Sequence, residues 1–189
     1  SESGRALSFK AHPILQSKPN FVIAHGHYKG RYPDVVTRTQ ARRRLGYNED
    51  NALALFLGHL RPYKNAISLV EAFKASSSCN FRLLIAGTPS SDEMRQQLET
   101  ACKGEERITT HLQFISTEDI QYYLRAADIM VLPYETILNS GVALLALSFD
   151  CPVLAPEKGS LVDLQKQVGA DWVRLFNAQL TSDVLSRAL

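Results

Sequence analysis

Short, solidly apolar runs alternate with helix-like segments along most of this chain, and this alternation limits the fold more than any other feature. The runs do not alternate apolar with polar residues, and such runs are typical of strands buried on both faces of a parallel sheet. Turn residues such as Gly58 and Gly87 follow them directly. The sequence therefore predicts an α/β fold with a doubly wound, Rossmann-like parallel sheet.

The pattern also predicts the individual elements. Strands are expected at residues 21–24, 52–57, 82–86, 108–114, 129–132, 153–155 and 172–175. Helices are expected at residues 37–45, 65–76, 91–102, 117–126, 140–149, 161–168 and 181–189. Thr37 is a suitable N-cap for the first of these helices, and Gly46 is a suitable stop. Residues 1–36 fit the alternation poorly, so we predict an entering linker at 1–36 and one Rossmann-like domain at 37–189.

Charge and cysteine content narrow the class of protein. The net charge of the 189 residues is +2, which is too small to indicate a nucleic-acid partner. Arg42, Arg43 and Arg44 form a local basic run, which we interpret as the solvated face of a helix. The three cysteines have no metal-ligand spacing and favour a reducing compartment. No apolar run approaches the ~20 residues of a membrane span, and no signal-peptide core is present, so we expect a cytoplasmic protein.

The loop after the predicted strand at 52–57 carries two cations. Ligands of doubly wound sheets bind beyond the carboxyl ends of the strands, where this loop lies. Arg61 offers a planar fork for phosphate oxygens and Lys64 a point charge. We predict that both contact a phosphate. His59 is either a ligand contact or a simple strand-end side chain.

The loop at residues 133–142 leads from an apolar strand into an apolar helix. Bare N–H groups at a helix start bind anions, and Gly141 has no Cβ to keep a phosphate away. We therefore interpret Ser140, Gly141 and Val142 as the diphosphate end of a nucleotide-sugar site, with Ser140 acting as helix cap or phosphate ligand. Glu135 either accepts hydrogen bonds from sugar hydroxyls or is a solvated loop charge.

A few further residues are weaker candidates. Ile115, between Phe114 and Ser116 at another strand end, is expected to wall off a nucleobase. His25 and His27 are either structural or part of an active site. The dinucleotide motif GxGxxG and the Walker loop are absent, which disfavours dehydrogenases and P-loop enzymes.

From about residue 25 onward, the sequence resembles the C-terminal donor-binding domain of GT-B glycosyltransferases, in the glycosyl transferases group 1 and their relatives. The segments that carry the resemblance are AHGHY (24–28), LFLGHLRPYKN (55–65), LLIAG (83–87), AADIMVLPY (126–134), NSGVALLALSFDCPVLAP (139–156) and GSLVD (159–163). The last matches the Gly-Gly-x-x-Glu turn of that family, with Ser160 and Asp163 substituted.

The resemblance implies a hexosyl-transferring enzyme whose donor is a UDP- or GDP-sugar. It implies a saccharide or lipid-linked acceptor held by an N-terminal half that is missing here, so this half alone is expected to be inactive. A bacterial polysaccharide or glycolipid pathway, no metal cofactor and peripheral membrane contact through the missing half are further expectations. Lys64 falls on the diphosphate-binding lysine of the family. His59 takes the place of its arginine, and we expect Arg61 to substitute.

One departure concerns the paired glutamates of the family, which are separated by seven residues. The second position is Ala146 and the first falls near Leu138, so the ribose-binding carboxylate is absent. A divergent branch of the family is therefore expected, with the stereochemical outcome open. Two other functions remain as alternatives: a sugar-nucleotide epimerase of the same fold, and a non-catalytic nucleotide-binding or scaffolding module.

Overall fold

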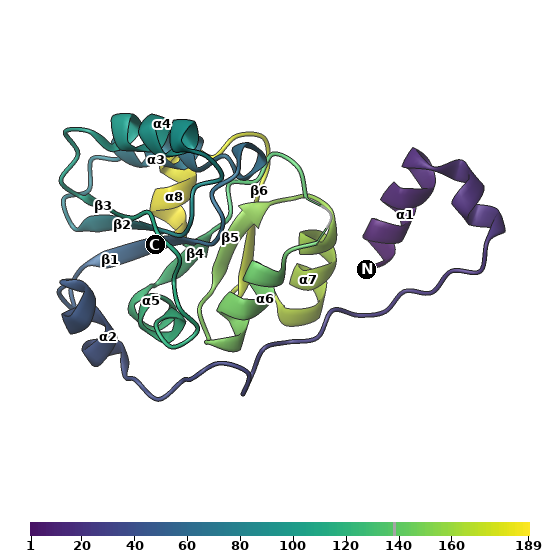
Figure 1. Cartoon of the computed structure of the whole chain (residues 1–189), viewed down its shortest axis with the longest axis horizontal. Coiled ribbons are helices and arrows are strands. Elements are labelled where there is room, and N and C mark those ends of the chain that lie inside the picture. The colour runs from purple at the N-terminus through teal and green to yellow at the C-terminus, as the bar shows by residue number, and fades with distance from the viewer. Residues whose placement is uncertain (138) are drawn as a thin grey trace.

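A six-stranded sheet with all strands parallel forms the centre of the protein, in the order β3-β2-β1-β4-β5-β6 (Figure 1). The computed structural model describes residues 1–137 and 139–189. The strands are β1 (Ala52–Leu57), β2 (Phe81–Ala86), β3 (Ile108–His111), β4 (Ile129–Val131), β5 (Val153–Pro156) and β6 (Val173–Phe176). The predicted doubly wound α/β fold is confirmed.

Helices cover both faces of this sheet, with α3, α4 and α8 on one side and α2, α5 and α6 on the other (Figure 1). The helices are α1 (Glu2–Ala11), α2 (Arg38–Leu45), α3 (Ala66–Lys74), α4 (Asp92–Cys102), α5 (Ile120–Ala126), α6 (Gly141–Ser148), α7 (Ser160–Val168) and α8 (Ser182–Ala188), with 3-10 turns η1 (Pro13–Ser17) and η2 (Pro62–Lys64). Thr37 caps α2 through a reciprocal capping box with Gln40, and Gly46 ends that helix in a left-handed conformation, as predicted. No helix of the described residues is long and apolar enough to cross a bilayer.

The predicted strands match the structure to within one residue at each end, with two exceptions. Residues 21–24 form no strand: they run as an extended segment in which Phe21 is 86% and Ile23 is 85% exposed. A strand needs a hydrogen-bonded neighbour, and this segment pairs with none of the described residues. The strand predicted at 108–114 ends at His111, because the Gln113 N–H turns back to donate to the His111 carbonyl.

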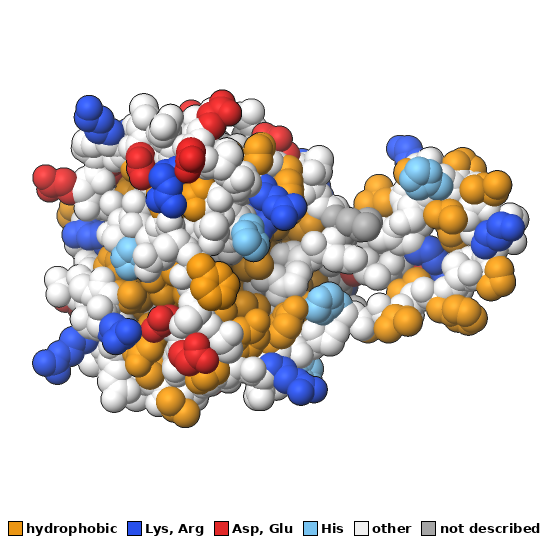
Figure 2. Space-filling model, in the orientation of Figure 1, with side chains coloured by type: hydrophobic (Ala, Val, Ile, Leu, Met, Phe, Trp, Pro, Cys, Tyr) orange, Lys and Arg blue, Asp and Glu red, His pale blue; other side chains and the backbone are white. Residues whose placement is uncertain are grey.

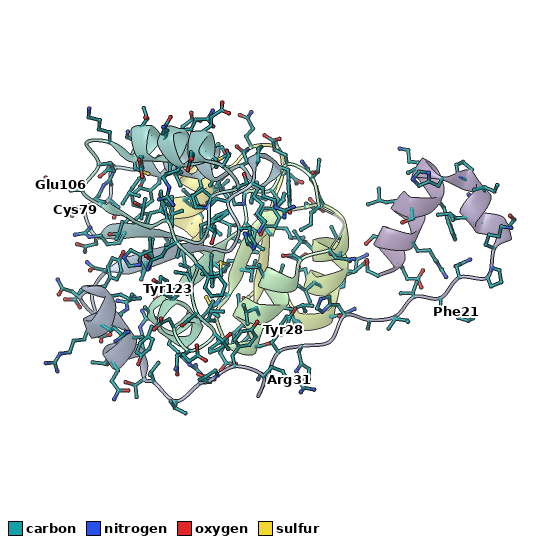
Figure 3. The ribbon with its side chains drawn as sticks, viewed as in Figure 1. Phe21, Tyr28, Arg31, Cys79, Glu106 and Tyr123 are labelled. Atoms are coloured by element: carbon teal, nitrogen blue, oxygen red, sulfur yellow. The ribbon has the colours of Figure 1, made fainter. Side chains whose placement is uncertain are left out.

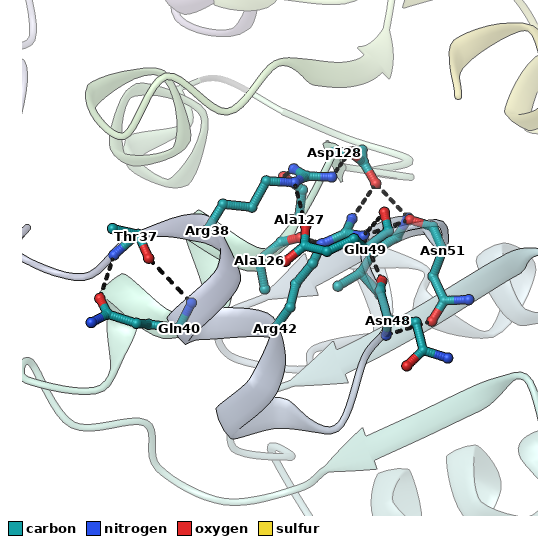
Figure 4. A network of polar contacts seen from close by, with 11 residues as sticks. Thr37, Arg38, Gln40, Arg42, Asn48, Glu49, Asn51, Ala126, Ala127 and Asp128 are labelled. Carbon is teal, nitrogen blue, oxygen red and sulfur yellow. Dashed lines mark hydrogen bonds and ion pairs between the residues drawn. The ribbon is translucent and has the colours of Figure 1, made fainter.

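The interpretation of the arginine run as a solvated face is wrong for Arg42, which is fully buried. Its guanidinium donates hydrogen bonds to the carbonyls of Asn48, Glu49 and Asn51, at 2.7, 2.7 and 2.9 Å, and pairs with Asp128 at 2.7 Å (Figure 4). Arg42 faces inward because these acceptors all gather at the end of α2. The group joins α2, the loop before β1 and the loop before β4.

Glycines bring the site-forming loops together at the carboxyl end of the sheet. A Cβ on Gly87, whose φ is +138°, would lie 1.9 Å from the Gly58 carbonyl oxygen. The two loops therefore pass too close to each other for any side chain at position 87. The Leu60 N–H donates to Thr88, and the Glu135 N–H donates to the Tyr63 carbonyl at 3.0 Å. The loops after β1, β2 and β4 are thereby held side by side.

The first 20 residues lie outside this layered arrangement. Helix α1 and turn η1 sit to one side of the sheet, and an extended segment leads from them to α2 (Figure 1). Ser3 of α1 donates to the Asp163 carboxylate of α7 through its N–H and its hydroxyl, at 3.2 and 2.5 Å. Exposed apolar side chains gather on this part of the molecule (Figure 2), among them Leu7, Ile14 and Phe21.

Candidate functional site

A cleft of about 630 Å³ opens at the carboxyl ends of β1 and β4. Tyr63 and Lys64 line it from the loop after β1, and Tyr134 lines it from the loop after β4. The start of α6, at 140–142, closes another side. This is the end of a parallel sheet at which ligands bind, as the sequence predicts.

Lys64 is a buried cation in this cleft, only 8% exposed. Its ammonium lies 5.5 Å from the centroid of the Tyr134 ring, and no hydrogen bond or ion pair engages it within the described residues. Burial, and secondarily the positive charge of Arg61, lower the pKa of Lys64. An unpaired buried cation is costly, so this arrangement favours an anionic ligand.

Tyr134 supplies a second unsatisfied group to the same cleft. Its side chain is 4% exposed, and its hydroxyl has no hydrogen-bond partner among the described residues. The nearby Ser140 hydroxyl instead accepts the Ala143 N–H at 3.1 Å. Burial raises the pKa of Tyr134, so this occluded hydroxyl keeps its proton.

The first turn of α6 presents main-chain donors. Ser140 is the N-cap of the helix, so the cap role expected of it is present. The Gly141 and Val142 N–H groups have no partner within the described part of the chain. A Cβ placed on Gly58 would lie 3.6 Å from the Val142 side chain and 3.4 Å from the Lys64 ammonium. The lysine ammonium and the helix start therefore lie on the same side of Gly58, close to its backbone.

The predicted site residues separate into two groups. Lys64, Ser140, Gly141 and Val142 converge on the cleft. Arg61 is exposed and lines a separate groove of about 340 Å³ against α4. The structure therefore places Lys64 in the cleft and Arg61 in the neighbouring groove.

The remaining predicted residues lie outside the residues that line the cleft. His59 and Glu135 are exposed, and the hydrogen bonds of Glu135 are made by its main chain: its N–H donates to Tyr63, and its carbonyl accepts from Lys158. Ile115 packs half-buried against the core beyond β3, the edge strand farthest from α6 and α7. Ala146 is fully buried on α6. The other position discussed for a family glutamate, Leu138, falls outside the described residues.

Sequence reasoning missed Tyr63 and Tyr134, which lie with their rings 6.2 Å apart and nearly perpendicular. Tyr134 follows β4 directly, at a strand end where a ligand contact is expected, and this position is a signal that could have identified it. Tyr63 immediately precedes Lys64 and carries no comparable signal.

Comparisons with known proteins identify the family of this chain. Residues 37–168 match the family described as glycosyl transferases group 1. A GDP-mannose:glycolipid 4-beta-D-mannosyltransferase of Xanthomonas campestris pv. campestris is 33% identical over 167 residues, which are 88% of this chain and 45% of the relative. The chain thus spans about half the length of this relative.

Solved structures share the fold at low sequence identity. A sucrose-phosphate synthase from Thermosynechococcus elongatus superposes with a TM-score of 0.74 at 21% identity, covering 98% of this chain and 46% of that one. Anabaena Alr3699/HepE, solved in complex with UDP-glucose, gives a TM-score of 0.63 at 18% identity, covering 79% and 41%. The chain therefore belongs to the glycosyl transferases group 1 family, and it has the fold of the C-terminal domain of a GT-B glycosyltransferase.

Proposed function

We propose that this chain binds a nucleoside-diphosphate sugar, a UDP- or GDP-sugar, for transfer of the sugar to a saccharide or lipid-linked acceptor. The observation that carries this proposal is the buried Lys64, which has no anionic partner among the described residues and faces the start of α6 across one cleft. A diphosphate would satisfy the lysine together with the N–H groups of Gly141 and Val142, which have no partner among the described residues.

The proposed chemistry is breakage of the bond between the sugar C1 and the diphosphate. The acceptor oxygen bonds to C1, its proton passes to a base on another part of a longer enzyme, and the electron pair of the broken bond leaves on the diphosphate. Negative charge grows on the leaving group during this step. Lys64 and the α6 N-terminus are fixed where that charge grows, so they stabilise the transition state. Arg61 adds positive potential from the neighbouring groove.

The known proteins support a nucleotide-sugar ligand. The name of the Xanthomonas relative gives GDP-mannose as its donor and a glycolipid as its acceptor, and the Anabaena neighbour is described in complex with UDP-glucose. Since these two differ in the base, we propose the donor class and treat uridine and guanosine as alternatives for experiment. We also propose that no metal is needed, because Lys64 and the helix N-terminus already oppose the diphosphate charge.

Calorimetric titration of the chain with UDP, GDP, UDP-glucose and GDP-mannose tests this function. Each titration is run with Mg²⁺ and with EDTA. We expect the uridine ligands, the guanosine ligands or both to bind, to bind equally well in EDTA, and to raise the melting temperature. A ligand at 100 times its Kd stabilises the fold by about 2.7 kcal/mol. If none of the four ligands binds, the proposed function is wrong.

Transfer must be tested separately from binding. A protein that joins this chain to an acceptor-binding half should release the nucleoside diphosphate when given the bound sugar nucleotide and a lipid-linked saccharide. If nucleotide binds tightly and no transfer or donor hydrolysis occurs in that protein, a non-catalytic binding module is the better description.

A further inference from the structure

The extended segment that precedes α2 is fastened along the outer face of the domain. The Tyr28 N–H donates to the Ser148 hydroxyl at the end of α6, at 2.9 Å. Arg125 holds the Asp34 carboxylate through two hydrogen bonds of 2.6 Å each. These contacts at both ends fix the path of residues 28–34 against α5 and α6.

Because of this path, the Tyr28 side chain lies beside α6 (Figure 3). Its backbone N–H is bonded to Ser148 at one end of α6. Its hydroxyl reaches Gly141 at the other end, where a Cβ would lie only 3.1 Å from the hydroxyl oxygen. Gly141 and Ser148 are seven residues apart, so they lie on the same face of the helix. The tyrosine therefore spans the length of α6, and the glycine provides the space for its hydroxyl.

His25 reaches the same helix end. Its Nε2 lies 3.7 Å from the Cβ position of Gly141, and its ring centroid is 5.8 Å from that of Tyr28. The His25 Nδ1 is 2.8 Å from the Gly26 carbonyl oxygen, which can only accept, so Nδ1 carries a proton and donates it. In the neutral ring, Nε2 is then left as an acceptor. No hydrogen bond from the Tyr28 hydroxyl is present among the described residues.

The position of His25 connects two hollows. It lines a second cleft, of about 380 Å³, which shares Asn139 and Ser140 with the first. Leu144 and Leu161 give this second cleft an apolar wall, while the rest of its lining is largely polar and includes His25, Asn139 and Asp163. An apolar wall that faces many hydrogen-bonding groups suits a hexose, which has C–H surface as well as several hydroxyls.

We propose that the segment before α2 completes the donor site with two ligand contacts. The Tyr28 hydroxyl donates to the phosphate that binds at Gly141. The His25 Nε2 accepts a hydrogen bond from a hydroxyl of the attached hexose in the second cleft. This inference rests on the proposed function, since it assumes that a sugar nucleotide binds at the α6 N-terminus.

Four variants test the assignment: Tyr28→Phe with Tyr32→Phe as its control, and His25→Ala with His27→Ala as its control. Tyr32 packs edge-on against Tyr28 with ring centroids 5.9 Å apart, and His27 belongs to the same exposed segment. Each variant is titrated with the nucleoside diphosphate and with the sugar nucleotide that the wild-type chain binds. Thermal melting confirms that each remains folded.

The two residues should have different signatures. Tyr28→Phe should weaken the diphosphate and the sugar nucleotide alike, by about tenfold, because one hydrogen bond to a charged group is lost. His25→Ala should weaken only the sugar nucleotide, by about fivefold, because a bond to a neutral hydroxyl is lost. Tyr32→Phe and His27→Ala should bind both ligands as the wild type does.

Unchanged affinities in Tyr28→Phe and His25→Ala, while Lys64→Met loses binding, would overturn this inference and leave the proposed function standing. A loss of diphosphate affinity in His25→Ala as large as its loss of sugar-nucleotide affinity would overturn the hexose contact alone. Failure of the wild-type chain to bind any sugar nucleotide would instead contradict the proposed function.

Discussion

The ammonium of Lys64 lies over the ring of Tyr134, 5.5 Å from its centroid, and the two side chains come from loops that follow different strands. The ring is a weak partner for a cation, worth about 0.5–2 kcal/mol, and it leaves the N–H donors of the ammonium unused. Lys64 is thus held in place inside the cleft while remaining available to an anion.

Replacing Lys64 by methionine should separate its contribution to ligand binding from its effect on stability. Lys64→Met keeps the apolar stem but removes the charge, so the affinity for the nucleoside diphosphate should fall by about tenfold or more. The free energy of unfolding should stay the same or rise, because the variant removes a buried charge that has no ion-pair partner among the described residues. Calorimetry and urea unfolding measure the two quantities. Lys103→Met, at an exposed position, is the control, and an equal loss of affinity in both variants would contradict the assignment.

The affinity should also depend on pH through Lys64. Burial and Arg61 lower the pKa of this lysine from its usual 10.5, so it loses its proton in the free protein at a lower pH than an ordinary lysine does. A bound diphosphate favours the charged form. Binding should therefore weaken as the pH rises toward 10.5, because a proton must first be taken up.

Lys64→Arg provides the comparison for this pH effect, since arginine keeps its charge throughout that range. The ratio of wild-type to variant affinity, measured across a series of pH values, removes any titration of the nucleotide itself. We expect this ratio to fall with rising pH. A ratio that stays constant would show that Lys64 does not change its protonation when the ligand binds.

The meeting of Lys64 with the α6 N-terminus was predictable from sequence, because buried parallel strands deliver their following loops to one edge. The N-cap at Ser140 was predictable for a local reason: its hydroxyl bonds three residues ahead, to Ala143. The direction of the Arg61 side chain was not predictable in this way. It depends on how the loop after β1 packs against α4, which no local pattern encodes.

The burial of individual polar residues was the second feature that could not be predicted from sequence. Arg42, Arg43 and Arg44 look alike in sequence, yet only Arg42 is buried. Its burial depends on a pairing with Asp128, which is 86 residues away, and no local pattern reveals this pairing. Tyr134 is buried because the loop after β4 is tied back to the loop after β1 at Tyr63. Contacts between segments distant in sequence decide both cases.

The buried arginine leads to a prediction on stability. Arg42→Lys keeps the positive charge but replaces a planar fork with a point donor, so several of the carbonyls now bonded lose their partner. We expect the free energy of unfolding to fall by about 2–4 kcal/mol. Arg43→Lys, on the exposed side of the same helix, should change it by less than about 0.5 kcal/mol. Urea denaturation followed by circular dichroism measures both, and similar values for the two would contradict the structural role of Arg42.

An ion pair directly before β3 should make the free energy of unfolding depend on pH in the acidic range. The Arg107 guanidinium donates two hydrogen bonds to Glu105, at 2.9 and 2.8 Å, and two more to the carbonyls of Ser76 and Ser78. The hydrogen bonds from Arg107 lower the pKa of Glu105 from 4.5 to about 2. Because the folded-state pKa is the lower one, this stabilisation is present above pH 4.5 and is lost as the pH falls toward 2.

Glu105→Gln should therefore destabilise the protein at pH 7 by about 1–2 kcal/mol, and the difference from wild type should shrink as the pH is lowered from 4.5 toward 2. Glu106→Gln is the matched control: Glu106 is exposed at the edge of the molecule (Figure 3) and should show no such convergence. Urea midpoints for the three proteins at a series of pH values provide the measurement. A Glu105→Gln difference that stays constant down to pH 2 would mean that the pair with Arg107 does not stabilise the fold.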